Sequence, residues 1–246
     1  MFKSYASSGL VVAGALAASM LFPISASALP IFTISSTSTF DPAFCVGGLA
    51  CVPGGKSIFW VDVPGNPPVS TLTLLDLTPL EIVAGGDAVQ ITKLTHDNVI
   101  IPQAFGYVSK ILNTLTLEAG GLPPGPGPLL VSEPSEVNIA FKETLNAAPC
   151  ADPAPVGSIC DDFFTFSPDG LSPLKFLFDG DKFLLTFAIV AGDGTFVDGN
   201  TVFTAEGGKS ELFVTAKIIQ VPEPVSLALL GLGLLGIGLT TRQRKM

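Results

Sequence analysis

The chain has little of what most enzymes and metal sites use. Among its 246 residues are one histidine, one tryptophan and four cysteines, and only 13% of the residues are charged. A single histidine excludes a zinc site built on several imidazoles. Neither a Gly-x-Ser-x-Gly elbow nor a phosphate-binding P-loop occurs. The sequence therefore gives no pattern for nucleophilic or nucleotide-dependent catalysis, and we expect a protein that is not an enzyme and has no cofactor.

Basic side chains are also few, and the formal net charge is −9 at pH 7. Such a surface repels phosphate backbones, so nucleic acid is not an expected partner. Solubility, or attraction of divalent cations, is the more natural use of the negative charge. By contrast the chain holds 26 glycines, 21 prolines and 18 phenylalanines. Together with abundant Ser and Thr, this composition is typical of an extracellular β-protein.

Residues 1–28 have the organisation of a secretory signal peptide. Lys3 gives a positive start, residues 10–22 are apolar, and Ala26-Ser27-Ala28 forms a small-residue cleavage site. The apolar segment is too short for a comfortable membrane span. We therefore predict removal of residues 1–28 and a mature chain that begins near Leu29.

The last 26 residues, 221–246, divide into a Pro-Glu-Pro tripeptide, an apolar run and a basic end. The two prolines prevent helix through the tripeptide. The uncharged run 225–239 would give about 22 Å of helix, less than the roughly 30 Å hydrocarbon layer. Cations beside it would snorkel and stay on the cytoplasmic side, which places the body outside. The residues of this signal are Val221, Pro222, Glu223, Pro224, Arg242, Arg244 and Lys245.

This tail resembles the PEP-CTERM sorting signal of Gram-negative bacteria, in which the same three parts occur in the same order at the C-terminus. The resemblance implies recognition by a membrane-embedded exosortase and cleavage near the tripeptide. It also implies an intermediate anchored in the inner membrane by the helix 225–239, and then delivery to the cell surface or to an exopolysaccharide matrix such as a biofilm. A sorting signal is an address, so it discloses no activity of the body.

Residues 29–220 predict one all-β ectodomain, an antiparallel β-sandwich of jelly-roll-like architecture. Val137, Ile139 and Phe141 alternate with polar residues, which predicts a half-buried strand. The segment 183–190 is apolar on both faces and is expected to be central. The Pro/Gly-rich segment 120–128 favours a long surface loop over a linker between two domains. The expected strands are 57–63, 70–77, 88–95, 111–117, 136–142, 183–190 and 211–221.

The four cysteines fit an exported protein with two disulfides. Four cysteines allow three pairings, and we predict pairing of neighbours, Cys45 with Cys51 and Cys150 with Cys160, because each pair encloses a short turn-rich loop. Zinc is the alternative. Their spacings do not match paired zinc half-sites, and we expect no metal site in the protein.

Thr95, His96 and Asn98 form a Thr-His-x-Asn sequence that resembles the signature of the THxN subgroup of PEP-CTERM proteins. Two later segments, 141–146 and 160–164, are similar to segments of that subgroup. The subgroup has no assigned activity. The resemblance therefore implies a relationship and no mechanism.

Two interpretations of His96 differ in chemistry. As a functional residue it would be a metal ligand or a general base, oriented by Asp97. As a structural residue it would cap the end of a strand, in a turn where Asp97 and Asn98 bond nearby backbone groups. The second interpretation is favoured, because no other catalytic pattern accompanies the histidine.

Carboxylates offer two further alternatives. Three groups could supply oxygen ligands to calcium, although none matches the EF-hand loop, and their Asp-Gly and Gly-Asn sequences first of all predict hairpin turns. A hydrolase could also use a carboxylate pair, whose separation depends on the fold. The groups are Asp161 with Asp162, Asp179 with Asp181, and Asp193 with Asp198.

Trp60 and Tyr107 could stack on sugars, but the excess of phenylalanine favours a role in the core. The sequence thus predicts an exported, non-catalytic surface or exopolysaccharide-matrix protein that an exosortase sorts. One alternative is an extracellular module that binds polysaccharide or calcium. Another is an envelope hydrolase that uses carboxylates.

Overall fold

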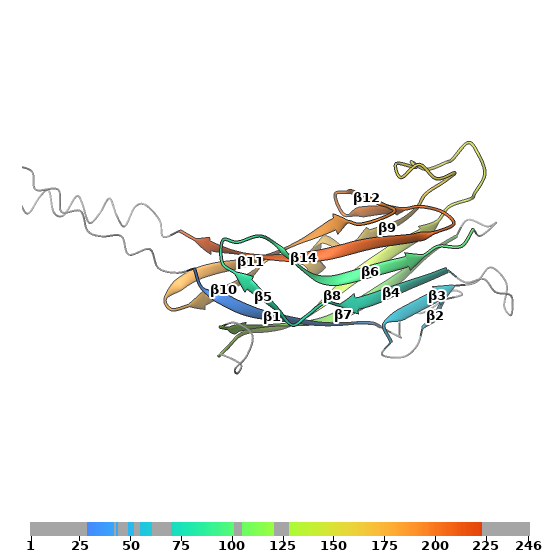
Figure 1. Cartoon of the computed structure of the whole chain (residues 1–246). Coiled ribbons are helices and arrows are strands. Elements are labelled where there is room, and N and C mark those ends of the chain that lie inside the picture. Colours follow the sequence, from blue (N-terminus) through green and yellow to red (C-terminus); the bar gives the residue numbers. More distant parts are fainter. Residues whose placement is uncertain are drawn as a thin grey trace, which may run out of the picture.

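The computed structural model describes residues 29–41, 43, 49–51, 55–60, 70–100, 105–120 and 128–222. The predicted signal peptide, residues 1–28, and the apolar run 225–239 lie outside these residues. The described part folds into two antiparallel sheets of seven strands each, which pack face to face as a sandwich (Figure 1). The predicted all-β antiparallel sandwich is confirmed. Among the described residues, no helix is both long and apolar enough to cross a membrane.

The first sheet has the strand order β12–β13–β9–β8–β7–β1–β5. Each neighbouring pair is antiparallel. Its strands are β1 (Ile31–Phe40), β5 (Leu80–Val83), β7 (Phe105–Ala119), β8 (Leu129–Glu143), β9 (Asp162–Phe166), β12 (Thr195–Asp198) and β13 (Thr201–Thr204).

The second sheet has the order β10–β11–β14–β6–β4–β3–β2, again with antiparallel neighbours. The short 3-10 helix η2 (Pro168–Leu171) packs against β8. The strands are β2 (Leu49–Cys51), β3 (Ser57–Trp60), β4 (Ser70–Asp76), β6 (Val89–Asp97), β10 (Leu174–Phe178), β11 (Asp181–Ala191) and β14 (Lys209–Val221).

Each predicted strand overlaps an observed one, and the alternation of Val137, Ile139 and Phe141 places all three in the core. The prediction of a central strand at 183–190 was wrong. β11 lies beside the edge strand β10, and within 183–190 only Phe183 and Leu185 are buried. One face of this apolar strand is therefore partly open to solvent, with Val190 41% exposed.

The predicted surface loop 120–128 connects β7 and β8, which pair with each other from Phe105 opposite Glu143 to Glu118 opposite Leu129. Ala119 N–H donates to Pro128 O at 3.1 Å, which holds the two ends of the segment together. Residues 121–127 lie outside the described part. The segment thus joins two strands of one sheet.

The interior contains two groups of buried side chains, one toward each end of the sandwich. One group includes Trp60, Phe141 and Phe164. The other includes Phe32 and Phe183. Burial of this apolar surface between the sheets is the main stabilising contribution to the fold.

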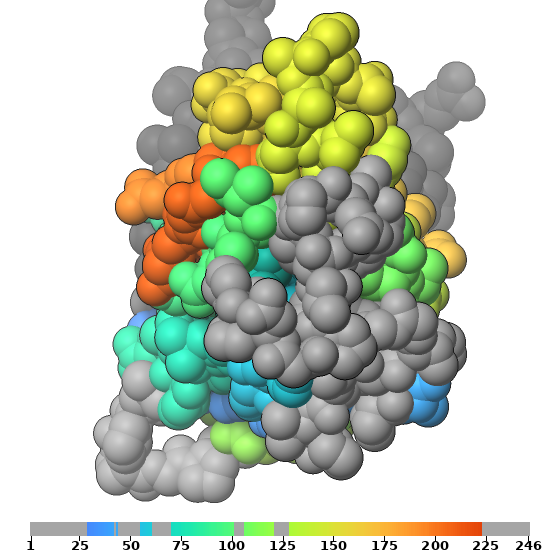
Figure 2. Space-filling view, turned by 90° about the vertical axis from the view of Figure 1, so that its right-hand side faces the viewer, coloured from blue at the N-terminus to red at the C-terminus, as the bar shows by residue number. Residues whose placement is uncertain are grey.

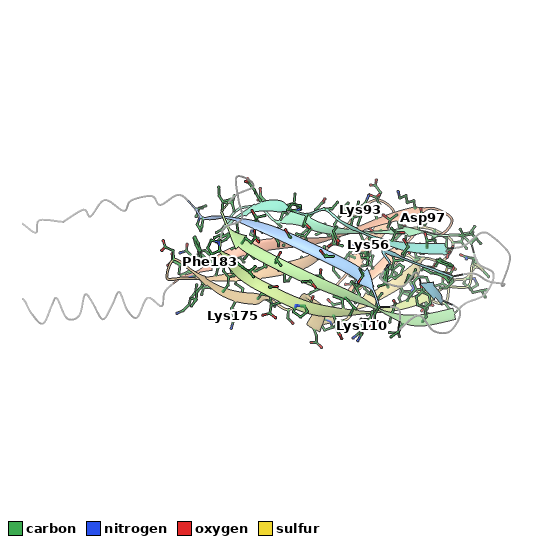
Figure 3. All side chains as sticks on the ribbon, turned by 90° about the horizontal axis from the view of Figure 1, so that it is seen from below. Lys56, Lys93, Asp97, Lys110, Lys175 and Phe183 are labelled. Atoms are coloured by element: carbon green, nitrogen blue, oxygen red, sulfur yellow. A yellow bond between two sulfur atoms is a disulfide. The ribbon has the colours of Figure 1, made fainter. Side chains whose placement is uncertain are left out.

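The described chain enters and leaves at one end of the sandwich (Figure 1). Pro30 O accepts a hydrogen bond from Ala84 N–H at 3.0 Å, and Ile218 O accepts one from Gly85 N–H at 2.8 Å, so the first and last strands meet at the β5 turn. Phe183 lies toward this end and Asp97 toward the other (Figure 3). The tail that follows β14 is therefore attached to the end opposite the one where β6 stops.

Candidate functional site

Three acidic side chains meet at the end of the sandwich where β6 stops. Glu143 is the last residue of β8, Asp162 is the first residue of β9, and Glu206 lies in the turn between β13 and β14. One carboxylate oxygen from each lies within 4.8 Å of the others. β13 pairs with β9 with Thr204 opposite Asp162, which brings the turn that follows Thr204 over the start of β9. We call these three residues the carboxylate cluster.

The segments around the carboxylate cluster form the end face that Figure 2 views directly. The yellow segment between β8 and β9 makes the upper part of that face. Beside it lie the green residues that follow β6 and the orange residues near the start of β14. Both sheets and the turn that crosses between them therefore contribute to the site.

Neutral donors hold one side of the carboxylate cluster. Trp60 Nε1 donates to Glu143 Oε2 at 3.1 Å. Asp162 Oδ1 accepts from the Thr144 backbone N–H at 2.7 Å, and Asp162 Oδ2 accepts from Asn98 Nδ2 at 2.9 Å. Among the described residues, Glu143 Oε1 is buried without a hydrogen-bond partner. The oxygens of Glu206 make no hydrogen bond of ordinary geometry, although the side-chain amides of Asn146 and Asn98 act on them. The cluster therefore has more acceptors than donors.

Burial and mutual repulsion both raise the pKa values of the three acids in the cluster. Burial, followed by the charge of Glu206, raises the pKa of Glu143 to about 8 against the opposing hydrogen bond from Trp60. Burial, followed by the charge of Glu143, raises the pKa of Asp162 to about 7. Burial and the charge of Asp162 raise the pKa of Glu206 to about 8. Within the described part of the chain, no lysine or arginine forms an ion pair with these acids.

His96 lies inside β6 and is 2% exposed, so the predicted turn is wrong. Its ring stacks on Trp60 at a centroid distance of 5.4 Å and meets Phe164 edge to face at 5.0 Å. Its Nδ1 lies 3.0 Å from Thr204 Oγ1. Burial lowers the pKa of His96 to about 3, so the ring is neutral at pH 7. His96 is therefore a core residue that supports Trp60.

The neighbours of His96 also differ from the prediction. Asp97 is exposed, and because successive strand residues point to opposite faces it cannot orient the His96 ring. The side chain of Asn98 does not bond its local backbone. It donates to Asp162 Oδ2 and, at 3.2 Å, to Ala205 O, across more than 60 positions in sequence. Thr95 lies on β6 opposite Thr73 of β4 and Glu211 of β14.

The other aspartates singled out from the sequence have structural roles. Asp161 accepts backbone hydrogen bonds from Val156 at 2.6 Å and Ser158 at 3.2 Å, inside the loop between β8 and β9. Asp179 and Gly180, both at positive φ, form the hairpin turn between β10 and β11. This conformation is the one that a two-residue hairpin of the Asp-Gly type requires.

Two more aspartates flank short turns around β12. Asp198 ends β12, and the following turn returns the chain to β13 as a hairpin. Asp193 does not belong to a hairpin, because β11 and β12 lie in different sheets. Its backbone O accepts from Glu211 N–H at 2.7 Å and so fixes the crossing. Of the predicted candidates for calcium, only Asp162 therefore joins a cluster of acids.

The predicted disulfide between Cys150 and Cys160 is confirmed, with the two Cα atoms 5.4 Å apart. It closes the loop between β8 and β9 two residues before Asp162. The predicted pair Cys45 and Cys51 lies outside the described residues, because Cys45 and the side chain of Cys51 are not placed. The confirmed disulfide constrains the segment that joins two acids of the carboxylate cluster.

The aromatic residues considered as sugar platforms belong to the core, as the composition favoured. Trp60 is 1% exposed, so a sugar could not stack on it. Tyr107 is partly buried, with its ring 5.3 Å from Trp60 and 4.8 Å from Phe141 between centroids. A Trp60 sugar platform is therefore excluded.

Sequence reasoning did not identify Glu143 or Glu206 as site residues. Glu143 does lie in the segment 141–146, one of three that resemble the subgroup, and the structure brings all three together. The Thr-His-x-Asn sequence supplies Asn98, segment 141–146 supplies Glu143, and segment 160–164 supplies Asp162. Glu206 carried no signal, because the glycines that follow it, Gly207 and Gly208, indicate a turn and nothing about a site.

The fold and the chain end together define a class of protein: a β-sandwich body whose last strand runs into a C-terminal sorting segment. The family described as PEP-CTERM protein-sorting motif matches residues 220–245. The chain thus carries a PEP-CTERM sorting motif, which indicates an exported protein that an exosortase processes through a membrane-anchored intermediate. No curated protein is significantly similar to the chain.

Proposed function

We propose that the protein is a non-catalytic component of the cell surface or exopolysaccharide matrix of a Gram-negative bacterium, released there after cleavage near Pro222-Glu223-Pro224. The observation that carries this proposal is the match of residues 220–245 to the sorting motif. That motif begins at the end of β14. The folded body therefore has no separate domain between itself and the tail, and it travels as the cargo of the sorting step.

The proposal is tested in the native host with a tail variant in which Pro222, Glu223 and Pro224 are all changed to Ala. The expected result is that the wild-type chain appears in the surface or exopolymer fraction, whereas the variant accumulates unprocessed in the membrane fraction. The matched control changes an exposed Glu-Pro pair of the body, Glu133→Ala with Pro134→Ala. It is expected to behave as wild type. Equal release of the tail variant would contradict the proposal.

We also propose membership of the THxN subgroup. Support comes from the meeting of its three resembling segments at one site, where Asn98 bonds Asp162 and a carboxylate oxygen of Glu143 lies within 4.8 Å of one of Asp162. A random four-residue match would give no reason for the later segments to converge. The test is a loss of stability when Asn98 is replaced by Ala, measured against the same replacement of the exposed Asn138.

The structure gives different support to two alternative functions that the sequence left open, a hydrolase and a calcium-binding module. A polymer-cleaving hydrolase is disfavoured, since Glu143 and Asp162 are both 0% exposed and a polysaccharide could not contact them in this structure. Calcium binding is favoured as a second candidate function by one observation, which is the gathering of three carboxylates with too few donors.

A further inference from the structure

We infer that Glu143, Asp162 and Glu206 bind one calcium ion at the end of the sandwich remote from the sorting tail. The inference rests on the cluster geometry and not on how the protein is sorted. Each residue contributes a carboxylate oxygen, and the three oxygens lie within 4.8 Å of one another. A cation between them at the usual Ca–O distance of about 2.4 Å would reach all three without a large rearrangement.

The second observation is that a buried carboxylate oxygen of the cluster has no hydrogen-bond partner. Glu143 is 0% exposed, and its Oε1 has no hydrogen-bond partner in the described part of the chain. The buried oxygens of Glu206 make no hydrogen bond of ordinary geometry, but the side-chain amides of Asn146 and Asn98 act on them. Buried polar atoms in native proteins are nearly always paired, so a buried carboxylate oxygen without a donor, beside two further acids, needs a cation or a proton. The side chain of Glu143 thus reaches into the cluster with an oxygen free for a ligand.

The surrounding hydrogen bonds match those of a supported metal site. Trp60 Nε1 fixes Glu143 by its other oxygen, and Asn98 and the Thr144 backbone fix Asp162. Donors of this kind orient carboxylate ligands and leave their remaining lone pairs for the metal. All three supports are neutral, so they leave the negative charge of the cluster for a cation to balance.

The donor set favours calcium over other common divalent ions. All donors of the cluster are carboxylate oxygens. His96 Nδ1 bonds Thr204, and His96 Nε2, although buried without a hydrogen-bond partner, is not among the atoms that lie within 4.8 Å of one another. Oxygen donors suit calcium and magnesium better than zinc or copper. Magnesium usually keeps several water molecules in an octahedral shell, for which the buried carboxylates of Glu143 and Asp162 leave little room.

The test uses the purified full chain with its disulfides intact, in a mild detergent because of the apolar run 225–239. Thermal unfolding is followed in EDTA and then in increasing CaCl2 at pH 7.5, with ionic strength matched by NaCl, and calorimetry measures the heat of calcium binding. A ligand that binds only the native state raises the melting temperature. We expect a rise of about 5 °C or more at 100-fold excess over Kd.

The variants are Glu143→Gln and Asp162→Asn, which keep side-chain shape and remove charge. Both variants are expected to fold in EDTA and to lose the calcium shift. Glu143→Gln relieves repulsion and should melt at or above the wild-type temperature. Asp162→Asn also loses one of the two acceptors for Thr144 N–H and Asn98 Nδ2, so it should melt at or below the wild-type temperature. Glu133→Gln, at an exposed position on the same strand as Glu143, serves as the matched control and is expected to keep it.

Three results would overturn the inference. Absence of both a calcium shift and a binding heat would mean that the acids share protons instead of a cation. A shift of equal size in the Glu143→Gln and Asp162→Asn variants would place calcium elsewhere on the acidic surface. An equal rise with MgCl2 would refute the choice of calcium. None of these outcomes bears on sorting, which is measured in the host.

Discussion

At the scale of residues, the carboxylate cluster rests on aromatic side chains that lie between the sheets. Phe164 packs against His96, His96 stacks on Trp60, and the indole N–H of Trp60 bonds Glu143. Since the buried His96 ring is neutral at pH 7, it cannot balance the acids with a positive charge. This end of the core therefore positions the acids while leaving their charge uncompensated.

Asn98→Ala should destabilise the fold by about 1–3 kcal/mol, because it leaves Ala205 O and a carboxylate oxygen of Asp162 without their shared donor. Urea unfolding in EDTA measures the change. Asn138→Ala, at an exposed position of β8, is the control and should alter stability by no more than about 0.5 kcal/mol. An Asn98→Ala chain as stable as this control would refute the bridging role.

The stability of the calcium-free protein should fall as pH rises from 6.5 to 8.5. The raised pKa values, about 8 for Glu143 and Glu206 and about 7 for Asp162, mean that the native state holds more protons than the unfolded state in this window. His96, with a pKa lowered to about 3, has the opposite effect only between about 3 and 6.5. Burial raises the pKa of Tyr107 well above 10, beyond the window.

Melting temperatures in EDTA across these pH values measure this effect. The Glu143→Gln chain should show a flatter profile, because it has one fewer raised pKa and less repulsion. Saturating calcium should reduce or reverse the slope, since the ion binds the deprotonated cluster best. A melting temperature that rises steadily from pH 6.5 to 8.5 in EDTA would contradict the assigned protonation.

At the scale of elements, the loop from 144 to 161 joins β8 to β9 and so links Glu143 with Asp162. It is held by the disulfide between Cys150 and Cys160 and by Asp161, which bonds the backbone of Val156. The loop contains no strand or helix in the described structure. The disulfide and these hydrogen bonds therefore hold the loop, which has no regular secondary structure to do so.

Replacing Cys150 and Cys160 together with Ser should lower the free energy of unfolding by about 2–3 kcal/mol, because the unfolded chain gains freedom when a loop of this length is opened. Ala151→Ser, an exposed change inside the same loop, is the matched control. Urea unfolding of both chains measures the effect. If the two midpoints agree, the disulfide does not stabilise the body.

Gly170 of η2 lies directly against β8. A Cβ at this position would lie 2.5 Å from Val137 Cγ2 and 2.8 Å from the backbone O of Glu136. Gly170→Ala should therefore cost about 1–3 kcal/mol, as overpacking does. Gly208→Ala, whose added Cβ would have no neighbour within 4 Å, is the control. Similar melting temperatures of the two variants would show that η2 can move away from β8.

The elements differ in how far the sequence predicts them. Strand β8 is readable around Val137 and Phe141 because apolar and polar residues alternate there. Strand β1 was not predicted, although Phe32, Ile34 and Phe40 face the core, because its inward positions also include serines. Strands β12 and β13 are only four residues long, too short for a period to appear.

The carboxylate cluster could not be predicted for a different reason. Glu143, Asp162 and Glu206 come from three separate strand ends, and only the pairing of β13 with β9 brings Glu206 to the others. No local spacing encodes this proximity. The tail is the opposite case, because Pro222-Glu223-Pro224 and the basic residues beyond it form one continuous pattern that is readable without a fold.

At the scale of the whole molecule, the two ends of the sandwich have different roles. The chain leaves β14 toward the sorting tail at one end (Figure 1). The segment between β8 and β9, which joins two acids of the carboxylate cluster, lies at the other end (Figure 2). With β14 spanning 13 residues, these ends are roughly 40 Å apart. While the tail anchors the intermediate, the cluster therefore points away from the attachment point.

The central claim is that this body is exported and released through its tail, and intact mass spectrometry of the protein from the native host's envelope and exopolymer fractions tests it most directly. The account predicts a chain that begins near Leu29, ends near Pro224 and is lighter by the hydrogens of two disulfides. Any additional mass would identify a group attached during processing. A chain that still ends at Met246 in those fractions would contradict the account.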